Sequence, residues 1–127
     1  MKPKTIGNLQ KAVAKLLQFT SQKNPSELER AGVIQAFEFT YELMWKAFKE
    51  IAEGDGLSAP SPKSACKAAF QLGLITEESV WLEIIKDRNL TCHTYNETLA
   101  QEIYLRIRDR YVAAMQATLH NFLQRRT

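Results

Sequence analysis

The sequence has few of the side chains that form metal sites or disulfides. It contains two cysteines, Cys66 and Cys92, which lie far apart, and its two histidines are not clustered. There is no Cys-x-x-Cys pair, whereas a structural zinc site needs four grouped sulfur or nitrogen ligands. This scarcity excludes a structural zinc site and predicts reduced thiols in a cytoplasmic protein.

The sequence also lacks the long apolar runs of membrane and secreted proteins. No run approaches the ~20 residues needed to cross a bilayer. The basic start at residues 1–5 is followed by polar residues instead of the apolar core of a secretory signal. A net charge of +3 permits an anionic partner, but the chain has no dense basic stripe of the kind typical of a DNA-binding protein. We therefore expect a soluble, cytoplasmic protein with no membrane association.

The spacing of apolar residues is helical nearly throughout, and no strand-like alternation or internal repeat competes with it. A chain of 127 residues, of which 45% are hydrophobic and 24% charged, is typical of one globular domain, here residues 1–127. We expect helices at about 5–20, 24–53, 61–73, 76–88 and 96–126. Because the connections are short, the sequence predicts an all-α, antiparallel up-down four-helix bundle with an extra short helix.

Capping residues mark the expected helix boundaries. Asn24 is the expected cap of the second helix, with Pro25 in its first turn. Gly32 is where a bend or a new start within this helix is expected. The other expected caps are Ser61, residues 76–78 and Asn96, and the expected stops are residues 54–56 and Gly73.

The apolar band of the second helix is broader than one bundle core requires. One stripe consists of Phe37, Tyr41, Met44 and Phe48, while Phe39, Leu43, Trp45 and Ala47 extend the band to other faces. The excess favours a second copy of the chain across a two-fold axis, that is, a homodimer. The alternative is a helix buried centrally among the others of one monomer.

Charged residues on the same helix form an i, i+4 ladder of Glu38, Glu42 and Lys46. Such a ladder is ordinarily a solvated face of ion pairs, each contributing a few tenths of a kcal/mol. The alternative is a polar wall that faces a cleft.

Three groups suited to phosphate and proton chemistry lie close together in residues 88–95. On an unbroken helix, at about 100° per residue, His93 lies about 140° from Arg88, and Tyr95 about 200° from His93. The three converge only if the helix breaks, and the poor helix formers in residues 89–94 predict a break. An extended backbone then places His93 and Tyr95 on one face, and Arg88 reaches the same pocket from the end of the preceding helix.

The chemistry of these groups is specific. Arginine binds a phosphate through two parallel hydrogen bonds, and histidine titrates near neutral pH, so Arg88 and His93 together support transesterification of RNA without a metal. Tyr95 offers a hydroxyl for binding a phosphate, for orienting the histidine or for modification. The structural alternative is an arginine that closes a helix, a loop histidine and a half-buried tyrosine.

Residues 32–46 resemble the second-helix signature of the nucleotidyltransferase substrate-binding proteins of the HEPN superfamily. The resemblance continues, in order, at residues 69–70, 73–75, 81, 87–89 and 93–97. It implies a helical bundle that dimerises, with the polar motif near the dimer cleft. It also implies a partner, a separate minimal nucleotidyltransferase, and no cofactor or metal.

The resemblance implies two functions for the same residues. In the first, the protein is a binding subunit that presents a nucleotide or an acceptor to its partner, with Arg88, Asn89, His93, Tyr95, Glu42 and Lys46 at the cleft. In the second, it is similar to HEPN toxins, which are metal-independent ribonucleases carrying Arg-x4-His-x-Tyr. Arg88 and His93 are then catalytic, and the partner silences the protein by transferring AMP to Tyr95.

Overall fold

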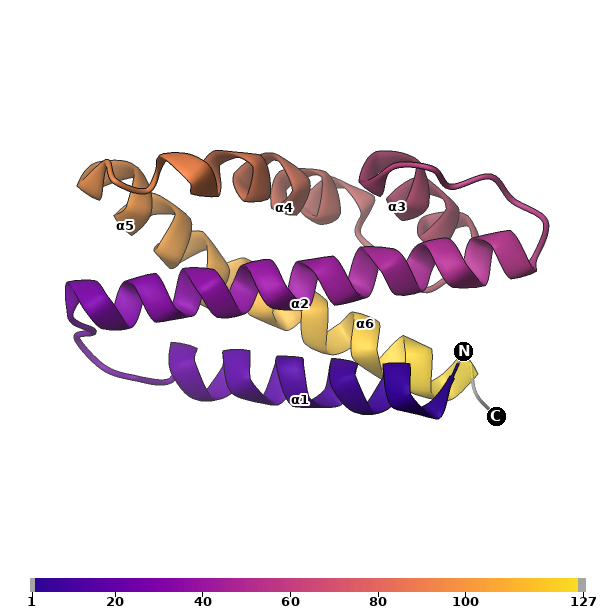
Figure 1. Ribbon diagram of the computed structural model, residues 1–127, viewed down its shortest axis with the longest axis horizontal. Helices are drawn as coiled ribbons and strands as arrows, with labels where there is room; N and C mark the ends of the chain where they lie inside the picture. Colours follow the sequence, from indigo (N-terminus) through magenta and orange to yellow (C-terminus); the bar gives the residue numbers. More distant parts are fainter. Residues whose placement is uncertain (1, 126–127) are drawn as a thin grey trace.

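The computed structural model describes residues 2–125 as a helical bundle (Figure 1). Its helices are α1 Pro3–Thr20, α2 Glu27–Gly54, α3 Pro62–Gln71, α4 Glu78–Leu90, α5 Glu97–Arg106 and α6 Val112–Arg125. A 3-10 turn at Thr91–His93 follows α4, and a π-helical turn at Ile107–Tyr111 joins α5 to α6. No residue in the described range 2–125 is in a strand, which confirms the all-α bundle.

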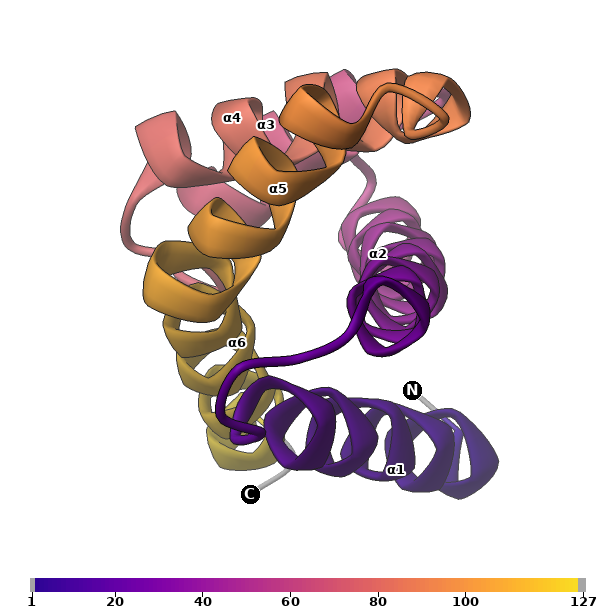
Figure 2. The same cartoon turned by 90° about the vertical axis from the view of Figure 1, so that its left-hand side faces the viewer.

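The long helix α2 is the centre of the arrangement. It packs against α1, α3 and α5, while α6 packs against α1 and α3 against α4. Figure 1 shows α3 and α4 one after the other along one side of α2, with α1 along the other side. The end-on view in Figure 2 shows α5 and α6 closing the bundle opposite α2. As a result, α4 ends at the same end of the bundle where α2 begins.

The first helix forms as its spacing predicts. Ile6, Leu9, Val13 and Leu16 are buried and repeat every three or four residues, so they make one inward stripe. The helix begins at Pro3, two residues before the expected start, because proline fits the first helical position.

The start of α2 differs from the expectation that Asn24 caps it. The cap is Ser26, whose side chain accepts a hydrogen bond from the Glu29 amide while the Glu29 side chain accepts one from the Ser26 amide. This reciprocal capping box satisfies two backbone donors, whereas an Asn24 cap satisfies one. Asn24 instead takes a left-handed conformation, with φ of 49°, in the loop before the helix.

Gly32 produces no bend, since α2 is unbroken from Glu27 to Gly54. A glycine inside a helix costs about 1 kcal/mol relative to alanine, and the burial of neighbours such as Val33 and Phe37 offsets this. The expected stripe of Phe37, Tyr41, Met44 and Phe48 is confirmed, because all four side chains are buried.

The boundaries of α3 follow the sequence, but the cap of α4 does not. Ser61 caps α3 with Pro62 in its first turn, and Gly73 has a φ of 77°, as expected. Thr76 is not a cap: the residue before α4 is Glu77, and it makes no side-chain capping bond. The first half of α4 is held by packing, because the Trp81 ring meets the Phe48 ring edge-on with centroids 5.0 Å apart.

The last helix is interrupted by a π-helical turn that the sequence analysis did not predict. Asn96 caps α5 as expected, its side chain accepting from the Leu99 amide at 3.1 Å. The buried residues Ile103, Ile107, Tyr111 and Met115 then follow at intervals of four. Each interval of four overshoots a full α-helical turn by about 40°. The wider π turn absorbs this drift and keeps the side chains facing the core.

None of the helices in the described part of the chain is both long and apolar enough to cross a membrane.

Candidate functional site

The corner between α4 and α5 contains the three residues of the sequence motif. The expected break is confirmed, but α4 continues through Leu90, two residues beyond Arg88, before it begins. The backbone of residues 91–93 forms a 3-10 turn, so the expectation of extended backbone was wrong. The cause is local: the Thr91 hydroxyl lies 2.7 Å from the Arg88 carbonyl, and the Thr94 hydroxyl donates to the Thr91 carbonyl at 3.0 Å. Such short-range bonds favour tight turns over strands.

His93 and Tyr95 nevertheless lie together. Their rings are edge to face, with centroids 6.0 Å apart and an angle of 80° between the planes. Both side chains are exposed, and Tyr95 is 83% accessible. The alternative of a tyrosine half-buried in the core is therefore wrong. The turn thus presents an imidazole and a phenol hydroxyl side by side to solvent.

Arg88 contacts α2 instead of the two rings. Its Nη1 lies 3.3 Å from Glu38 Oε2 and donates to the Thr91 hydroxyl at 3.1 Å. The Thr91 hydroxyl is also 2.9 Å from Glu38 Oε2. The side chains of Arg88 and Glu38 are each about one-third exposed, at 31% and 33%. A phosphate that approaches Arg88 therefore competes with a carboxylate already in contact with it.

Glu38 is a site residue that sequence reasoning missed. It had been placed in the solvated ladder, whereas its carboxylate joins α2 to the end of α4. The spacing within residues 88–95 carries no signal of it, since it lies on a helix about fifty residues earlier. The one hint in the sequence is that Glu38 lies one helical turn before Glu42, on the same face of the helix.

The other expected site residues lie further along α2 and at the end of α4. Lys46 pairs with Glu42 at 3.8 Å, and the Trp45 indole donates to Glu42 at 3.2 Å. The Glu42–Lys46 part of the ladder is thereby confirmed, and both residues continue the Glu38 face along α2. The Asn89 side chain is exposed at the end of α4, and its carbonyl accepts from the Cys92 thiol at 3.3 Å.

A buried carboxylate lies directly behind Arg88. The Asp87 side chain is only 5% exposed and receives Arg106 Nε at 2.6 Å, Arg106 Nη2 at 2.9 Å and the Tyr111 hydroxyl. The hydrogen bond to Asp87 raises the pKa of Arg106, and burial, together with Asp87, raises the pKa of Tyr111. Sequence reasoning missed Asp87, Arg106 and Tyr111 as a polar group, because Tyr111 has the spacing of a core residue.

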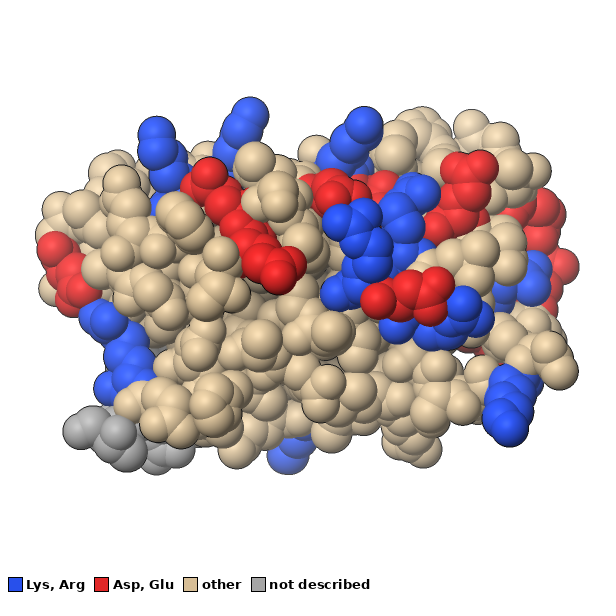
Figure 3. All heavy atoms as spheres, turned by 180° about the vertical axis from the view of Figure 1, so that it is seen from behind, with Lys and Arg blue, Asp and Glu red and all other residues tan. Residues whose placement is uncertain are grey.

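Arginines across the molecule are paired with carboxylates. Within residues 2–125 each arginine forms at least one ion pair, at positions 30, 88, 106, 108, 110 and 125. The face seen from behind shows basic and acidic groups side by side (Figure 3). This face therefore has no basic stripe of the kind that binds nucleic acid along its length.

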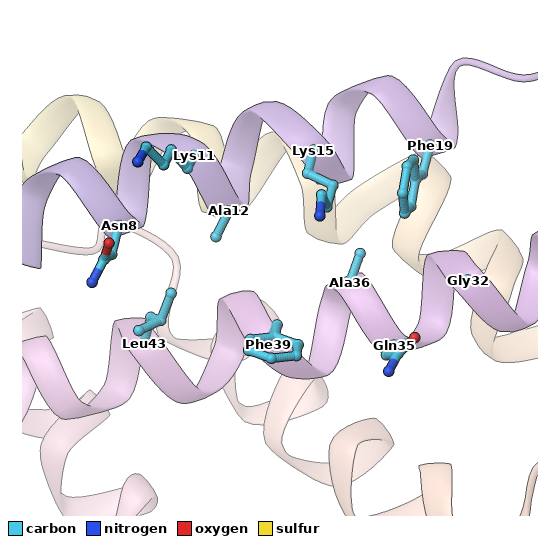
Figure 4. Close-up of a pocket in the computed structure, with 10 residues that line it drawn as sticks. All are labelled: Asn8, Lys11, Ala12, Lys15, Phe19, Gly32, Gln35, Ala36, Phe39 and Leu43. Atoms are coloured by element: carbon cyan, nitrogen blue, oxygen red, sulfur yellow. The ribbon is translucent and has the colours of Figure 1, made fainter.

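A groove of about 550 Å³ is lined by residues of α1 and of the face of α2 that includes Phe39. Figure 4 shows Lys15 and Phe19 projecting from α1 toward α2, with Phe39 and Leu43 on α2. Phe39 is 65% exposed and Leu43 half-buried, so part of the apolar band expected beyond the core is present, but Ala47, which was expected in the same part, is buried in the core. If α2 were simply buried among the other helices of one monomer, Phe39 would be covered, but it is exposed in the single chain.

The comparisons with known proteins agree with the fold. A family model described as "Nucleotidyltransferase substrate binding protein like" matches residues 4–125. The chain belongs to this family. The match covers the whole bundle from α1 to α6, including the corner at residues 88–95.

Two solved structures share the fold. A Thermus thermophilus protein is 39% identical, with a TM-score of 0.81, and the alignment covers 88% of this chain and 96% of that one. A Haemophilus influenzae protein, described as revealing the fold of a substrate-binding domain of a nucleotidyltransferase, is 30% identical, with a TM-score of 0.76 and coverage of 94% and 99%.

A third relative carries a different functional name. A Haemophilus influenzae protein named "Probable ribonuclease HepT" is 37% identical over 84 residues, which are 62% of this chain and 58% of that protein. The match thus spans little more than half of the relative's length.

Proposed function

We propose that the protein is the nucleotide- or substrate-binding subunit of a separate minimal nucleotidyltransferase, and that the Arg88–His93–Tyr95 corner holds the phosphate-bearing substrate. The observation that carries this proposal is the pair of exposed His93 and Tyr95 rings on the turn that follows α4, whose last turn bears the partly exposed Arg88. The family to which the chain belongs supports the same role.

The residues divide the work of binding. The Arg88 guanidinium exchanges Glu38 for a phosphate, which binds it with two parallel hydrogen bonds. His93 and Tyr95 lie on the solvent side, where their rings and polar atoms contact the rest of the nucleotide. Asn89 at the end of α4 and Glu42 and Lys46 on α2 contribute polar contacts to the ligand or to the partner enzyme.

Specific observations also favour a second function, a metal-independent ribonuclease regulated at Tyr95. An exposed His93 is free to take a proton from a ribose 2′-hydroxyl, and a related protein is named a probable ribonuclease. The accessible Tyr95 hydroxyl suits modification by a partner. In that step the Tyr95 oxygen attacks the α-phosphorus of ATP, pyrophosphate leaves, and the phenol proton passes to a base of the partner enzyme.

We also propose that two copies of the chain associate through the outer face of α2. The exposed Phe39 lies between Lys11 and Lys15 on one side and the acidic Glu38 and Glu42 on the other. An interface between identical copies must be self-complementary, and this order of basic, apolar and acidic groups meets that condition. The candidate site then lies at the edge of the dimer interface.

The response of one variant separates the two functions. In the binding-subunit proposal, purified protein binds ATP, Arg88→Ala loses that affinity and His93→Ala keeps most of it. In the ribonuclease alternative, the protein cleaves single-stranded or structured RNA equally with and without a chelator, and His93→Ala abolishes cleavage. If ATP does not bind and no RNA is cleaved, both proposals fail.

The mass of the protein tests the modification directly. The protein is co-expressed with a minimal nucleotidyltransferase as the candidate partner, and the intact mass is compared between wild type and Tyr95→Phe. Increments of AMP that vanish in Tyr95→Phe support the toxin-type relationship. An unchanged wild-type mass contradicts modification at Tyr95 and favours the binding subunit.

A further inference from the structure

The inward face of α4 changes character at its last turn. Val80, Trp81 and Ile84 are buried apolar residues, and the next inward position is occupied by Asp87. A buried carboxylate is costly unless it is paired and hydrogen-bonded, and an apolar side chain of similar size is often equally stable or more so. The presence of Asp87 at this position therefore calls for a reason other than stability.

Both partners of Asp87 come from the ends of the π turn. Arg106 and Tyr111 are five residues apart, and on a regular α-helix two such residues point about 140° away from each other. A π turn, with its i→i+5 hydrogen bonds, brings residues five apart to one side. This is how Arg106 and Tyr111 both reach the Asp87 carboxylate. Turns of this kind occur frequently at functional sites.

The same contacts continue into the candidate site through α2. The Tyr111 ring stacks on Phe37 with centroids 5.7 Å apart, and its hydroxyl donates to Asp87. The residues next in sequence to these two, Glu38 and Arg88, contact each other at 3.3 Å. Tyr111 therefore contacts both Phe37 and Asp87. The residues that follow these two in the sequence, Glu38 and Arg88, form the ion pair of the site. One peptide unit joins Asp87 to Arg88.

We propose that Asp87, Arg106 and Tyr111 are positioning residues, which set the location of the last turn of α4 and thereby aim the Arg88 guanidinium at its ligand. This inference rests on the proposed function of Arg88 as the phosphate contact. The network does not touch the ligand. Its hydrogen bonds depend on direction, and they fix the position of Arg88.

A double-mutant cycle with ATP as the probe tests this coupling. Tyr111→Phe keeps the ring on Phe37 and removes only the hydroxyl, and Arg88→Lys keeps the charge but loses the planar fork that depends on orientation. We expect Tyr111→Phe to weaken ATP binding about fivefold with Arg88 present, and to have little effect in the Arg88→Lys background. An equal loss in both backgrounds contradicts positioning through Arg88.

A matched variant separates positioning from loss of stability. Phe122→Leu removes a buried ring that stacks on Phe48, in the same continuous α5–α6 segment but away from the corner. It is expected to lower the unfolding midpoint and leave ATP affinity unchanged. If Phe122→Leu weakens ATP binding as much as Tyr111→Phe does, the effect is one of stability and the inference is wrong.

Hydrogen exchange tests the positioning without any ligand. In Tyr111→Phe the amides of residues 88–92 are expected to exchange at least about fivefold faster than in wild type, while those of residues 81–84 keep their rates. Unchanged exchange at residues 88–92 overturns the inference even where ATP binds. Faster exchange in a protein that does not bind ATP leaves the network as the anchor of this turn and instead refutes the proposed function.

Discussion

The two halves of α4 are held by different forces. In the first half, Val80, Trp81 and Ile84 are buried among apolar neighbours, with Trp81 packed edge-on against Phe48. In the second half the contacts are polar: Asp87 with Arg106 and Tyr111, and Arg88 with Glu38. One helix thus passes from a packed core to a hydrogen-bonded corner within two turns.

The difference shows what each kind of contact contributes. Burial of apolar area is non-directional and supplies most of the free energy of folding. Hydrogen bonds to charged groups contribute less net free energy but depend on distance and angle, so they determine orientation. The candidate site lies at the half of the helix where orientation is fixed. The core half supplies the stability that the costly buried carboxylate requires.

The largest expected effect is at the apolar half. Trp81→Ala removes a fully buried ring and should lower the free energy of unfolding by about 4 kcal/mol. Urea denaturation at 10 °C measures the loss. Without urea, under conditions in which the variant is folded, its affinity for ATP should equal that of the wild type. A loss below about 1 kcal/mol contradicts the assignment of stability to this half.

The second effect concerns the buried carboxylate. Asp87→Ala leaves Arg106 and the Tyr111 hydroxyl without their partner and should cost about 3 kcal/mol of unfolding free energy. The matched control is Asp55→Ala, which removes the partner of Arg125 from an exposed pair and should cost less than about 1 kcal/mol. Equal losses for the two variants refute the distinction between a buried network and a surface ion pair.

A third effect appears at alkaline pH. Burial raises the pKa of Cys66 from its ordinary value of 9.0 to about 12, and that of Tyr41 from 10.0 to about 12. The unfolded chain therefore loses these protons first, and stability that is complete below pH 9 falls as the pH rises toward 12. Urea midpoints between pH 8 and pH 11 measure this decline. Cys66→Ala should remove the decline in stability between pH 9 and pH 10. If the urea midpoint of this variant falls as steeply over that range as that of the wild type, the thiol is not the cause.

The smallest expected effect on stability is at the site itself. Glu38→Gln removes the charge opposite Arg88 in a pair that is about one-third exposed, and it should change the unfolding free energy by less than about 1 kcal/mol. ATP affinity should rise severalfold, because the phosphate no longer displaces a carboxylate. Titration calorimetry compares the two proteins. Weaker binding by Glu38→Gln shows that Glu38 supports the ligand instead of competing with it.

The dimer offers an independent check of the outer face of α2. Phe39→Asp places a charge in the proposed interface and should convert a dimer to a monomer in sedimentation at micromolar concentration. Leu82→Asp, at an exposed residue of α4 away from this face, is the control and should leave the assembly unchanged. A monomeric wild-type protein contradicts the dimer proposal.

Features encoded by neighbouring residues were predictable from the sequence. Ser61, Gly73 and Asn96 mark helix ends because each acts on a backbone within a few residues. The prediction was wrong where two local signals compete. Asn24 and Ser26 are both good caps, and Ser26 is the cap because Glu29 forms a reciprocal hydrogen bond with it. The π turn had a local signal too, in apolar residues spaced by four, but it was interpreted as regular helix.

Features that depend on distant segments were not predictable. The sequence suggested a candidate site at Arg88, His93 and Tyr95, since all three lie in one short segment. It did not show that Glu38 faces Arg88, because that contact joins α2 to α4 across the bundle. Asp87 is likewise an ordinary surface-type residue in the sequence, and it is buried where the end of α5 and the π turn meet α4.

The central claim is that the corner at Arg88 binds the phosphate of a nucleotide. The most direct measurement is the affinity for ATP of two variants, Arg88→Ala and Arg125→Ala. Both remove an arginine from a partly exposed ion pair, with arginine side-chain exposures of 31% and 38%, but Arg125 pairs with Asp55 near the C-terminal end of α6. We expect Arg88→Ala to weaken ATP binding at least about tenfold and Arg125→Ala to bind ATP as wild type does. Equal affinities for the two variants contradict the central claim.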